Sequence, residues 1–164
     1  MSVDFQQFRD LVVRPVCDAF PRPAEATTLL MRIAAHESLG CRYLRQVGED
    51  GGYGPARGPW QMEPGTTFLV DDWCRNYRNW EKVPPKAQAL YNSLSADASL
   101  QADTRCAAIY ARFLLFASKW EMPPERADEL AFDIYLDVWR PGKPPTPETF
   151  LAEYQAWMGE GRLL

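Results

Sequence analysis

Residues 23–40 read PAEATTLLMRIAAHESLG and predict an amphipathic helix with a charge in an unexpected place. Proline favours the first turn of a helix and glycine favours its end, so the helix should run from about Pro23 to just before Gly40. One apolar stripe at helical spacing comprises Leu30, Ile33, Ala34 and Glu37. Arg32 and His36 fall on the other side, which we expect to face solvent. The stripe therefore places a carboxylate where an apolar side chain is expected.

A carboxylate against an apolar surface has a raised pKa, because burial disfavours its charged form. Glu37 could then donate a proton near neutral pH, as the general acid of a glycosidase must. The simpler interpretation is that Glu37 lies near a frayed helix end in solvent. In that case it could also pair with a nearby arginine of the set Arg32, Arg42 and Arg45.

Helical periodicity returns in most of the remaining chain, which predicts a mostly α-helical fold in one domain, residues 1–164. The further stripes are Phe5, Phe8, Leu11 and Val12; Leu69, Trp73, Tyr77 and Trp80; Ala87, Leu90, Tyr91 and Leu94; Cys106, Ile109, Tyr110, Phe113, Leu114 and Ala117; Ala127, Leu130, Ala131, Ile134, Tyr135 and Val138; and Phe150, Leu151, Tyr154 and Trp157. Pro15 should kink or end the first helix. Trp73, Tyr77 and Trp80 suit either core packing or a platform on which sugars stack.

Residues 41–67 interrupt this helical pattern with many glycines and prolines: CRYLRQVGEDGGYGPARGPWQMEPGTT. The segment is too irregular for a helix, and we expect a long ordered loop that forms at most a small β-hairpin. Tyr53 and Trp60 argue against disorder. Long irregular segments in compact domains are usually functional, so this one is a candidate to border a ligand cleft.

The combination of Glu37-Ser38 with the segment from Gly58 to Thr66 resembles the soluble lytic transglycosylases and goose-type lysozymes. Their pattern is glutamate-serine, followed by glycine-leucine-methionine-glutamine-x-x-proline-x-threonine. The likeness is stronger to phage-encoded lysozyme-like proteins, through Val13-Arg14-Pro15, Tyr43-Leu44-Arg45-Gln46 and residues 54–64. A looser match continues at residues 107–112 and 142–146. The resemblance implies a lysozyme-like helical domain with a glycine-rich cleft loop.

The resemblance also implies roles for individual residues. Glu37 is similar to the acid/base that protonates the oxygen between N-acetylmuramic acid and N-acetylglucosamine in peptidoglycan. Ser38 resembles a serine that positions this glutamate or the sugar, and Gln61 a glutamine whose amide bonds the sugar. Gly58 would let the loop backbone approach the glycan closely. Tyr110 resembles a cleft tyrosine, although its position equally suits core packing.

A second carboxylate distinguishes two versions of the chemistry. Hydrolysis by a lysozyme uses a pair of carboxylates, for which Glu49, Asp50 and Glu63 are the candidates; each could also be a solvated loop charge. The transglycosylase pattern needs one glutamate, because the 6-hydroxyl of the substrate attacks to give a 1,6-anhydro sugar. We favour this single-glutamate mechanism.

Two departures from the family pattern concern the walls of the cleft. Related phage proteins often have a tyrosine-asparagine pair before the late glycine-lysine turn, where this chain has Val138-Trp139-Arg140-Pro141. Pro59 replaces a usual aliphatic residue. The far wall of the cleft is therefore the part that the resemblance predicts least well.

Charge and composition narrow the choice of partners. The formal net charge is −4 and the pI is about 5.1, which disfavours nucleic acid and anionic membranes. We expect no membrane span, no secretory signal peptide, no metal site and no cofactor. The expected partners are peptidoglycan glycan strands and, for a phage protein, other structural proteins of the particle. The expected location is the virion, or the host cytoplasm before release.

Two alternatives to an active glycosidase have different sequence support. The acidic charge favours a catalytically inactive glycan-binding or structural module of a phage particle. The pair His36 and Cys41 could suggest a thiol nucleophile with its base, but no signature of that chemistry precedes the cysteine. Four widely spaced cysteines are expected to be thiols: Cys17, Cys41, Cys74 and Cys106.

Overall fold

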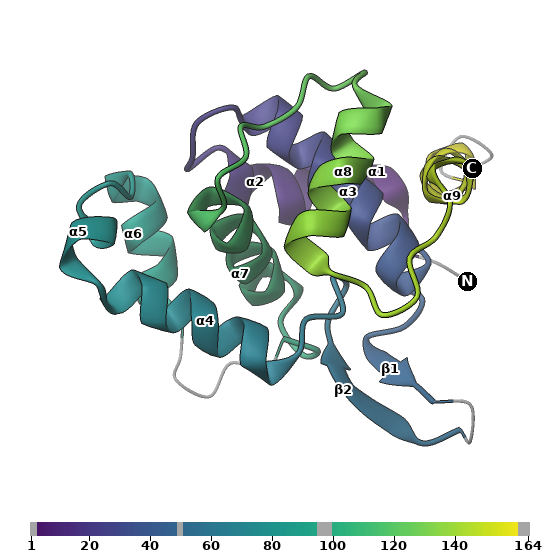
Figure 1. The fold of residues 1–164 in the computed structure, drawn as a ribbon, viewed down its shortest axis with the longest axis horizontal. Coiled ribbons are helices and arrows are strands. Elements are labelled where there is room, and N and C mark those ends of the chain that lie inside the picture. Colours follow the sequence, from purple (N-terminus) through teal and green to yellow (C-terminus); the bar gives the residue numbers. More distant parts are fainter. Residues whose placement is uncertain (1–2, 49–50, 95–99, 161–164) are drawn as a thin grey trace.

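The computed structural model describes residues 3–48, 51–94 and 100–160, which form a mostly helical structure with one small hairpin (Figure 1). The elements are α1 (Phe5–Phe8), a π-helical turn η1 (Arg9–Val13), α2 (Arg14–Cys17), α3 (Pro23–Ser38), β1 (Arg45–Val47), β2 (Tyr53–Arg57), α4 (Pro64–Arg75), α5 (Tyr77–Trp80), α6 (Pro85–Asn92), α7 (Thr104–Ala117), α8 (Asp128–Trp139) and α9 (Pro147–Glu160). The prediction of a mostly α-helical fold is confirmed, and the glycine-rich segment does contain a small antiparallel hairpin.

Helix α3 lies at the centre of the helical packing, in contact with α2, η1, α7 and α9. It begins at Pro23 and ends where Leu39 and Gly40 both take positive φ, as the sequence predicts. The prediction that the side of α3 with Arg32 and His36 faces solvent is wrong. Arg32 is only 5% exposed and bonds the backbone carbonyl of Glu125 at 2.8 Å, and His36 is half-buried. The reason is that α9 covers this side of α3.

The N-terminal helical run continues through Pro15 to Cys17. The π-helical turn η1 directly precedes α2, in which Pro15 occupies the first turn. A proline inside a helix lacks an N–H and meets the carbonyl of the preceding turn, and a wider turn accommodates it. The expected disturbance at Pro15 therefore takes the form of a π turn within a continuing run.

The segment expected to carry Leu69, Trp73, Tyr77 and Trp80 on one helical face is two helices, so that prediction is wrong. Helix α4 ends at Arg75, and α5 starts at Tyr77. Between them Asn76 is extended, and its side chain accepts a hydrogen bond from the backbone N–H of Arg78 at 3.0 Å. An asparagine that caps a new helix in this way ends the previous one.

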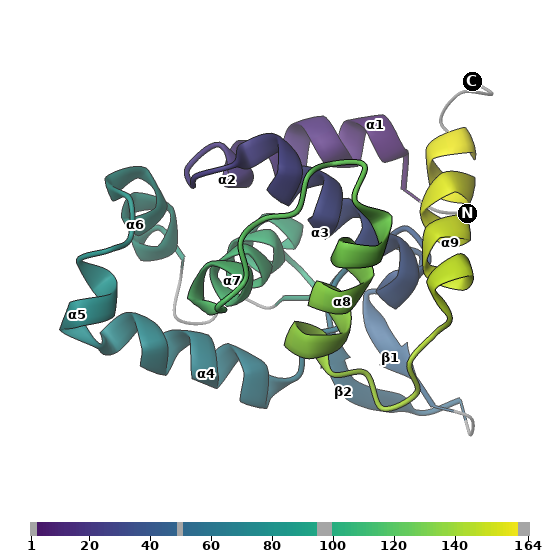
Figure 2. The ribbon, with the colours of Figure 1, turned by 45° about the horizontal axis from the view of Figure 1, so that its top comes forward.

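Two groups of elements lie at opposite ends of the molecule, and the hydrophobic core connects them. In both ribbon views α4, α5 and α6 lie at one end, and the hairpin and α9 lie at the other (Figures 1 and 2). One cluster of buried side chains connects them, including Phe8, Leu30 and Phe113. Helices α3, α7 and α8 lie between these two groups of elements, so their side chains can contact either group.

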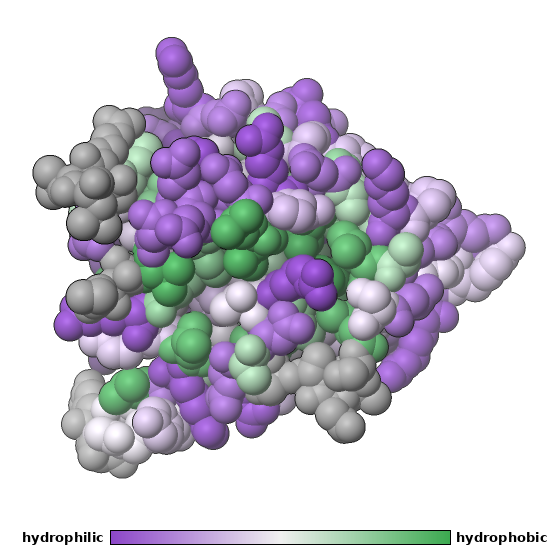
Figure 3. All heavy atoms as spheres, turned by 180° about the vertical axis from the view of Figure 1, so that it is seen from behind, coloured by the Kyte–Doolittle hydropathy of each residue, from purple (hydrophilic) through white to green (hydrophobic). Residues whose placement is uncertain are grey.

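The surface keeps some apolar area. Seen from behind, hydrophobic residues gather in a band across the middle of that face, bordered by hydrophilic residues (Figure 3). Apolar atoms contribute more than half of an ordinary protein surface, so such a band assigns no function by itself. Over the ranges that the structure describes, no helix has the length and apolarity needed to cross a bilayer.

Candidate functional site

A cavity of about 420 Å³ lies where the end of α3, the segment from β2 to α4 and the end of α8 meet. Its lining residues are Glu37, Gln46, Ala56, Gln61, Met62, Glu63, Thr66, Leu114, Val138, Trp139, Arg140, Pro141 and Gly142. Three of the residues predicted from the sequence thus line one cavity: Glu37 from the end of α3, and Gln61 and Glu63 from the segment between β2 and α4.

Glu37 occupies the last turn of α3 and is half-buried. The hydroxyl of Tyr135 on α8 donates a hydrogen bond to its Oε1 at 2.7 Å. Burial raises the pKa of Glu37, and this effect outweighs the Tyr135 hydrogen bond and the nearby His36, which both lower it. The carboxyl therefore holds its proton to a higher pH than an exposed glutamate does.

Tyr135 is a site residue that the sequence reasoning missed. Its ring is fully buried and stacks on Phe150, with centroids 4.9 Å apart. Burial and the charge of Glu37 raise its pKa, so the phenol stays protonated and remains a donor. The available signal was a tyrosine on an apolar helical stripe, because a buried hydroxyl there requires a hydrogen-bond partner.

His36 lies behind this pair and does not line the cavity. Its Nδ1 is 2.5 Å from Oε2 of Glu153 on α9, and its ring and that of Tyr135 form a T-shaped contact with centroids 5.5 Å apart. Instead of the expected exposure to solvent, His36 ties α9 to α3 and packs against the residue that donates to Glu37.

Gln61 borders the cavity in a strained backbone conformation with φ +45°. Its side-chain amide nitrogen donates to the carbonyl of Gly58 at 2.8 Å and to that of Tyr43 at 3.4 Å. Both N–H groups of the amide are therefore used to hold the loop. The acceptor oxygen is the part of the amide left for a ligand.

Gly58 adopts φ +75° and is buried, and it does not line the cavity. A Cβ at this position would lie 2.5 Å from the carbonyl oxygen of Leu100 and 3.2 Å from Cβ of Ala107. Position 58 therefore requires glycine because its backbone packs closely against Leu100 and Ala107. It does not require glycine for contact with a ligand in the cavity.

Ser38 and Tyr110, the other two predicted substrate contacts, also lie outside the lining. The fully buried Ser38 hydroxyl donates to the carbonyl of Ala34 at 2.9 Å and accepts from the backbone N–H of Cys41 at 3.0 Å, which closes the end of α3. Tyr110 donates to Oδ1 of Asp71 at 2.8 Å. Both residues act in holding elements together.

Of the three candidate second carboxylates, Glu63 is exposed, lines the cavity and directly precedes α4. Glu49 and Asp50 lie outside the residues that the structure describes. Among the described residues, the cavity therefore offers one partner carboxylate to Glu37.

Two tryptophans connect the walls of the cavity. The fully buried Trp60 donates from Nε1 to the carbonyl of Leu30 in α3 at 2.9 Å. The carbonyl of Trp60 accepts from Nε1 of Trp139 in α8 at 3.0 Å. Hydrogen bonds thus connect the glycine-rich segment to the helix that carries Glu37 and to the opposite wall of the cavity, residues 138–142.

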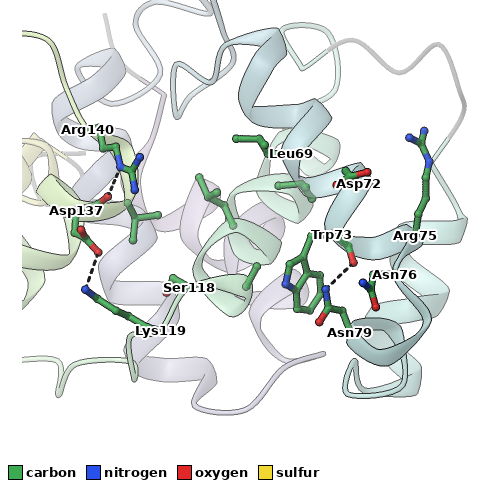
Figure 4. Close-up of a pocket in the computed structure, with 14 residues that line it drawn as sticks. Leu69, Asp72, Trp73, Arg75, Asn76, Asn79, Ser118, Lys119, Asp137 and Arg140 are labelled. Atoms are coloured by element: carbon green, nitrogen blue, oxygen red, sulfur yellow. Dashed lines mark hydrogen bonds and ion pairs between the residues drawn. The ribbon is translucent and has the colours of Figure 1, made fainter.

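A larger cavity of about 820 Å³ adjoins the first, between α4, α5, α7 and α8 (Figure 4). Trp73 lines it, whereas Trp80 packs against Phe113 and Tyr77 is 71% exposed. The three aromatic residues therefore do not form one platform. Both cavities share Leu114, Val138 and Arg140.

The cysteines show none of the features of a nucleophile. All four are free and buried, and burial raises the pKa of Cys41 to about 12. Within the described ranges, no group of three or more His, Cys, Asp or Glu side chains is arranged to hold a metal ion.

Comparison of the chain with protein-family models, curated proteins and solved structures finds no match.

Proposed function

We propose that this chain is a peptidoglycan-degrading glycosidase that cleaves the β-1,4 bond between N-acetylmuramic acid and N-acetylglucosamine. Glu37 is the general acid/base, and the domain belongs to the lysozyme-like proteins of phages and the soluble lytic transglycosylases. The observation that carries the proposal is the carboxyl of Glu37, half-buried at a cavity, with a raised pKa and a hydrogen bond from Tyr135. Gln61 and Glu63 on the same cavity support it.

In the first step the protonated Glu37 donates its proton to the scissile oxygen, and the bond from this oxygen to the sugar C1 breaks. The hydroxyl of Tyr135 stabilises the carboxylate that remains, because a hydrogen bond to an ionised acceptor is stronger than one to a neutral acceptor. The acceptor oxygen of Gln61 suits an N–H or hydroxyl of the sugar.

Two second steps are compatible with these residues. In the transglycosylase version, which we favour, the 6-hydroxyl of the muramyl residue attacks C1, and its proton passes to the Glu37 carboxylate. The product is a 1,6-anhydro sugar. In the hydrolytic version water takes the place of the 6-hydroxyl, and Glu63 is the second carboxylate.

The proposal is tested by zymography on peptidoglycan with the wild type and Glu37→Gln, which keeps the shape of the side chain and removes its proton transfer. We expect clearing by the wild type, and loss of at least about 100-fold in the variant, since general acid catalysis contributes that much or more. Circular dichroism checks that the variant folds. Equal clearing by both proteins would exclude Glu37 as the acid.

The products decide between the two second steps. Mass spectrometry of digested peptidoglycan should show 1,6-anhydromuramyl ends, and Glu63→Gln should leave their yield unchanged. Reducing ends alone, together with loss of activity in Glu63→Gln, would contradict the transglycosylase version.

The alternative is a catalytically inactive glycan-binding or structural module of a phage particle. The net charge of −4 favours it, because an anionic cell wall repels an acidic protein. Absence of clearing by the wild type, with retained binding to glycan, would support this module over the enzyme.

A further inference from the structure

The two cavities meet at Leu114, Val138 and Arg140, the lining residues that they share. Two of these side chains are apolar and the third is a cation. A ligand that extends from Glu37 into the larger cavity therefore passes Arg140. Among the described lining residues of the Glu37 cavity, Arg140 is the only one with a positive charge.

A hydrogen bond links the Nε atom of Arg140 to the last turn of α8. The residue ends α8 with φ +50°, and its Nε donates to the carbonyl of Asp137 at 3.1 Å. A cation is favourable at a helix C-terminus, which accounts for this contact. The contact uses one edge of the guanidinium, whose two terminal NH₂ groups are still available as donors.

The carboxylate of Asp137, three residues before Arg140, has other partners, and the charge of Arg140 also acts on it. Asp137 accepts a hydrogen bond from Nε1 of Trp120 at 2.7 Å and lies 3.8 Å from Nζ of Lys119. Figure 4 shows Arg140 and Lys119 on opposite sides of Asp137, with Asp72 across the cavity. Over the described part of the chain, Arg140 forms no ion pair, although Glu63 borders the same cavity.

We propose that Arg140 is a specificity-determining residue that binds a carboxylate carried by the glycan, so that acidic strands are preferred over neutral N-acetylglucosamine polymers. The inference rests on the proposed function, because it concerns the substrate of the same site. A guanidinium presents parallel N–H groups that match a carboxylate. The carboxylate can belong to the lactyl group of a muramic acid without peptide, or to the peptide attached to it.

The test measures affinity by calorimetry in the Glu37→Gln background, where cleavage does not interfere. The three ligands are tetra-N-acetylglucosamine, a tetrasaccharide of alternating N-acetylglucosamine and N-acetylmuramic acid, and the same tetrasaccharide with peptides. Adding Arg140→Gln should weaken binding of at least one acidic ligand about tenfold or more, as loss of a charged hydrogen bond does, and leave the neutral ligand within about twofold. Arg140→Lys should restore part of the loss, because it keeps the charge without the fork.

The matched control is Arg126→Gln, which removes an exposed arginine that lines neither cavity. It should bind all three ligands as its parent does. A loss in Arg140→Gln for the peptide-bearing ligand alone identifies a peptide carboxylate, and a loss for the peptide-free tetrasaccharide alone identifies the lactyl carboxylate, which the attached peptide converts to an amide. A loss for both acidic ligands shows that Arg140 binds either carboxylate. Equal effects on acidic and neutral ligands, or no effect, would overturn the role of Arg140 while clearing in the zymogram still supports the enzyme. Failure of the parent to bind any ligand, together with no clearing, would overturn both proposals.

Discussion

At the scale of single residues, the acid strength of Glu37 depends on its burial and on the hydrogen bond that it accepts from Tyr135. Burial raises the pKa of the carboxyl, and the tyrosine hydroxyl limits that rise by stabilising the ionised form. The balance suits a group that must release a proton and take one up again. The half-buried position of Glu37 agrees with its place on the apolar stripe.

Tyr135→Phe should change both the pKa of Glu37 and the maximal rate. Removing the hydroxyl removes an influence that lowers the pKa of Glu37, so that pKa should rise. The alkaline limb of the pH–activity profile, on which Glu37 loses its proton, should therefore move to higher pH. The maximal rate should fall about tenfold, because the carboxylate formed in the reaction loses a charge-assisted hydrogen bond. Both are measured with soluble peptidoglycan fragments between pH 4 and pH 9.

The control for this change is Tyr110→Phe. It removes a tyrosine hydroxyl that also donates to a carboxylate, that of Asp71, but the residue does not line the Glu37 cavity. Its profile should keep the wild-type alkaline limb. An unchanged limb in Tyr135→Phe would show that the hydroxyl does not influence the acid.

At the scale of elements, the hairpin and the segment that follows it form one wall of the cavity because they are fastened at several points. Trp60 bonds α3, the amide of Gln61 bonds two loop carbonyls, and Gly58 lies against the chain near α7. These contacts hold the irregular segment in one conformation, and packing against the chain near α7 requires a glycine at position 58.

Gly58→Ala should destabilise the protein by at least about 2 kcal/mol, since the residue has φ +75° and the new Cβ would meet a backbone carbonyl at 2.5 Å. Urea unfolding at neutral pH measures the change. The loss should extend to activity at temperatures where the variant remains folded, because the shifted loop carries Gln61.

The matched substitution is Gly65→Ala in the first turn of α4, where a Cβ would meet nothing within 4 Å. Its free energy of unfolding should stay the same or increase by up to about 1 kcal/mol. Equal stability of the two variants would contradict the packing role of Gly58.

At the scale of the whole molecule, the cavity exists because three distant parts of the chain converge. Helix α3 supplies Glu37, the segment after the hairpin supplies Gln61 and Glu63, and the end of α8 supplies the opposite wall. The same convergence joins this cavity to the larger one at Arg140. Substrate preference and proton transfer are thus properties of one continuous site in our proposal.

The sequence by itself determined what depends on neighbours along the chain. Apolar periodicity predicted most of the helices, Pro23 and Gly40 predicted the bounds of α3, and the stripe of that helix marked Glu37 as unusual. The glycine-rich segment between two helical regions was recognised as ordered and irregular. These features follow from backbone preference and from spacing within one turn or a few turns.

Only the tertiary structure decided which groups meet. Tyr135 reaches Glu37 from 98 positions away, and α9 covers the side of α3 that was expected to face solvent. Ser38, Gly58 and Tyr110 were predicted to contact substrate, but packing places them outside the lining of the cavity. A periodic pattern shows which face of a helix is apolar, but the partner of each polar group depends on contacts between segments that no local spacing records.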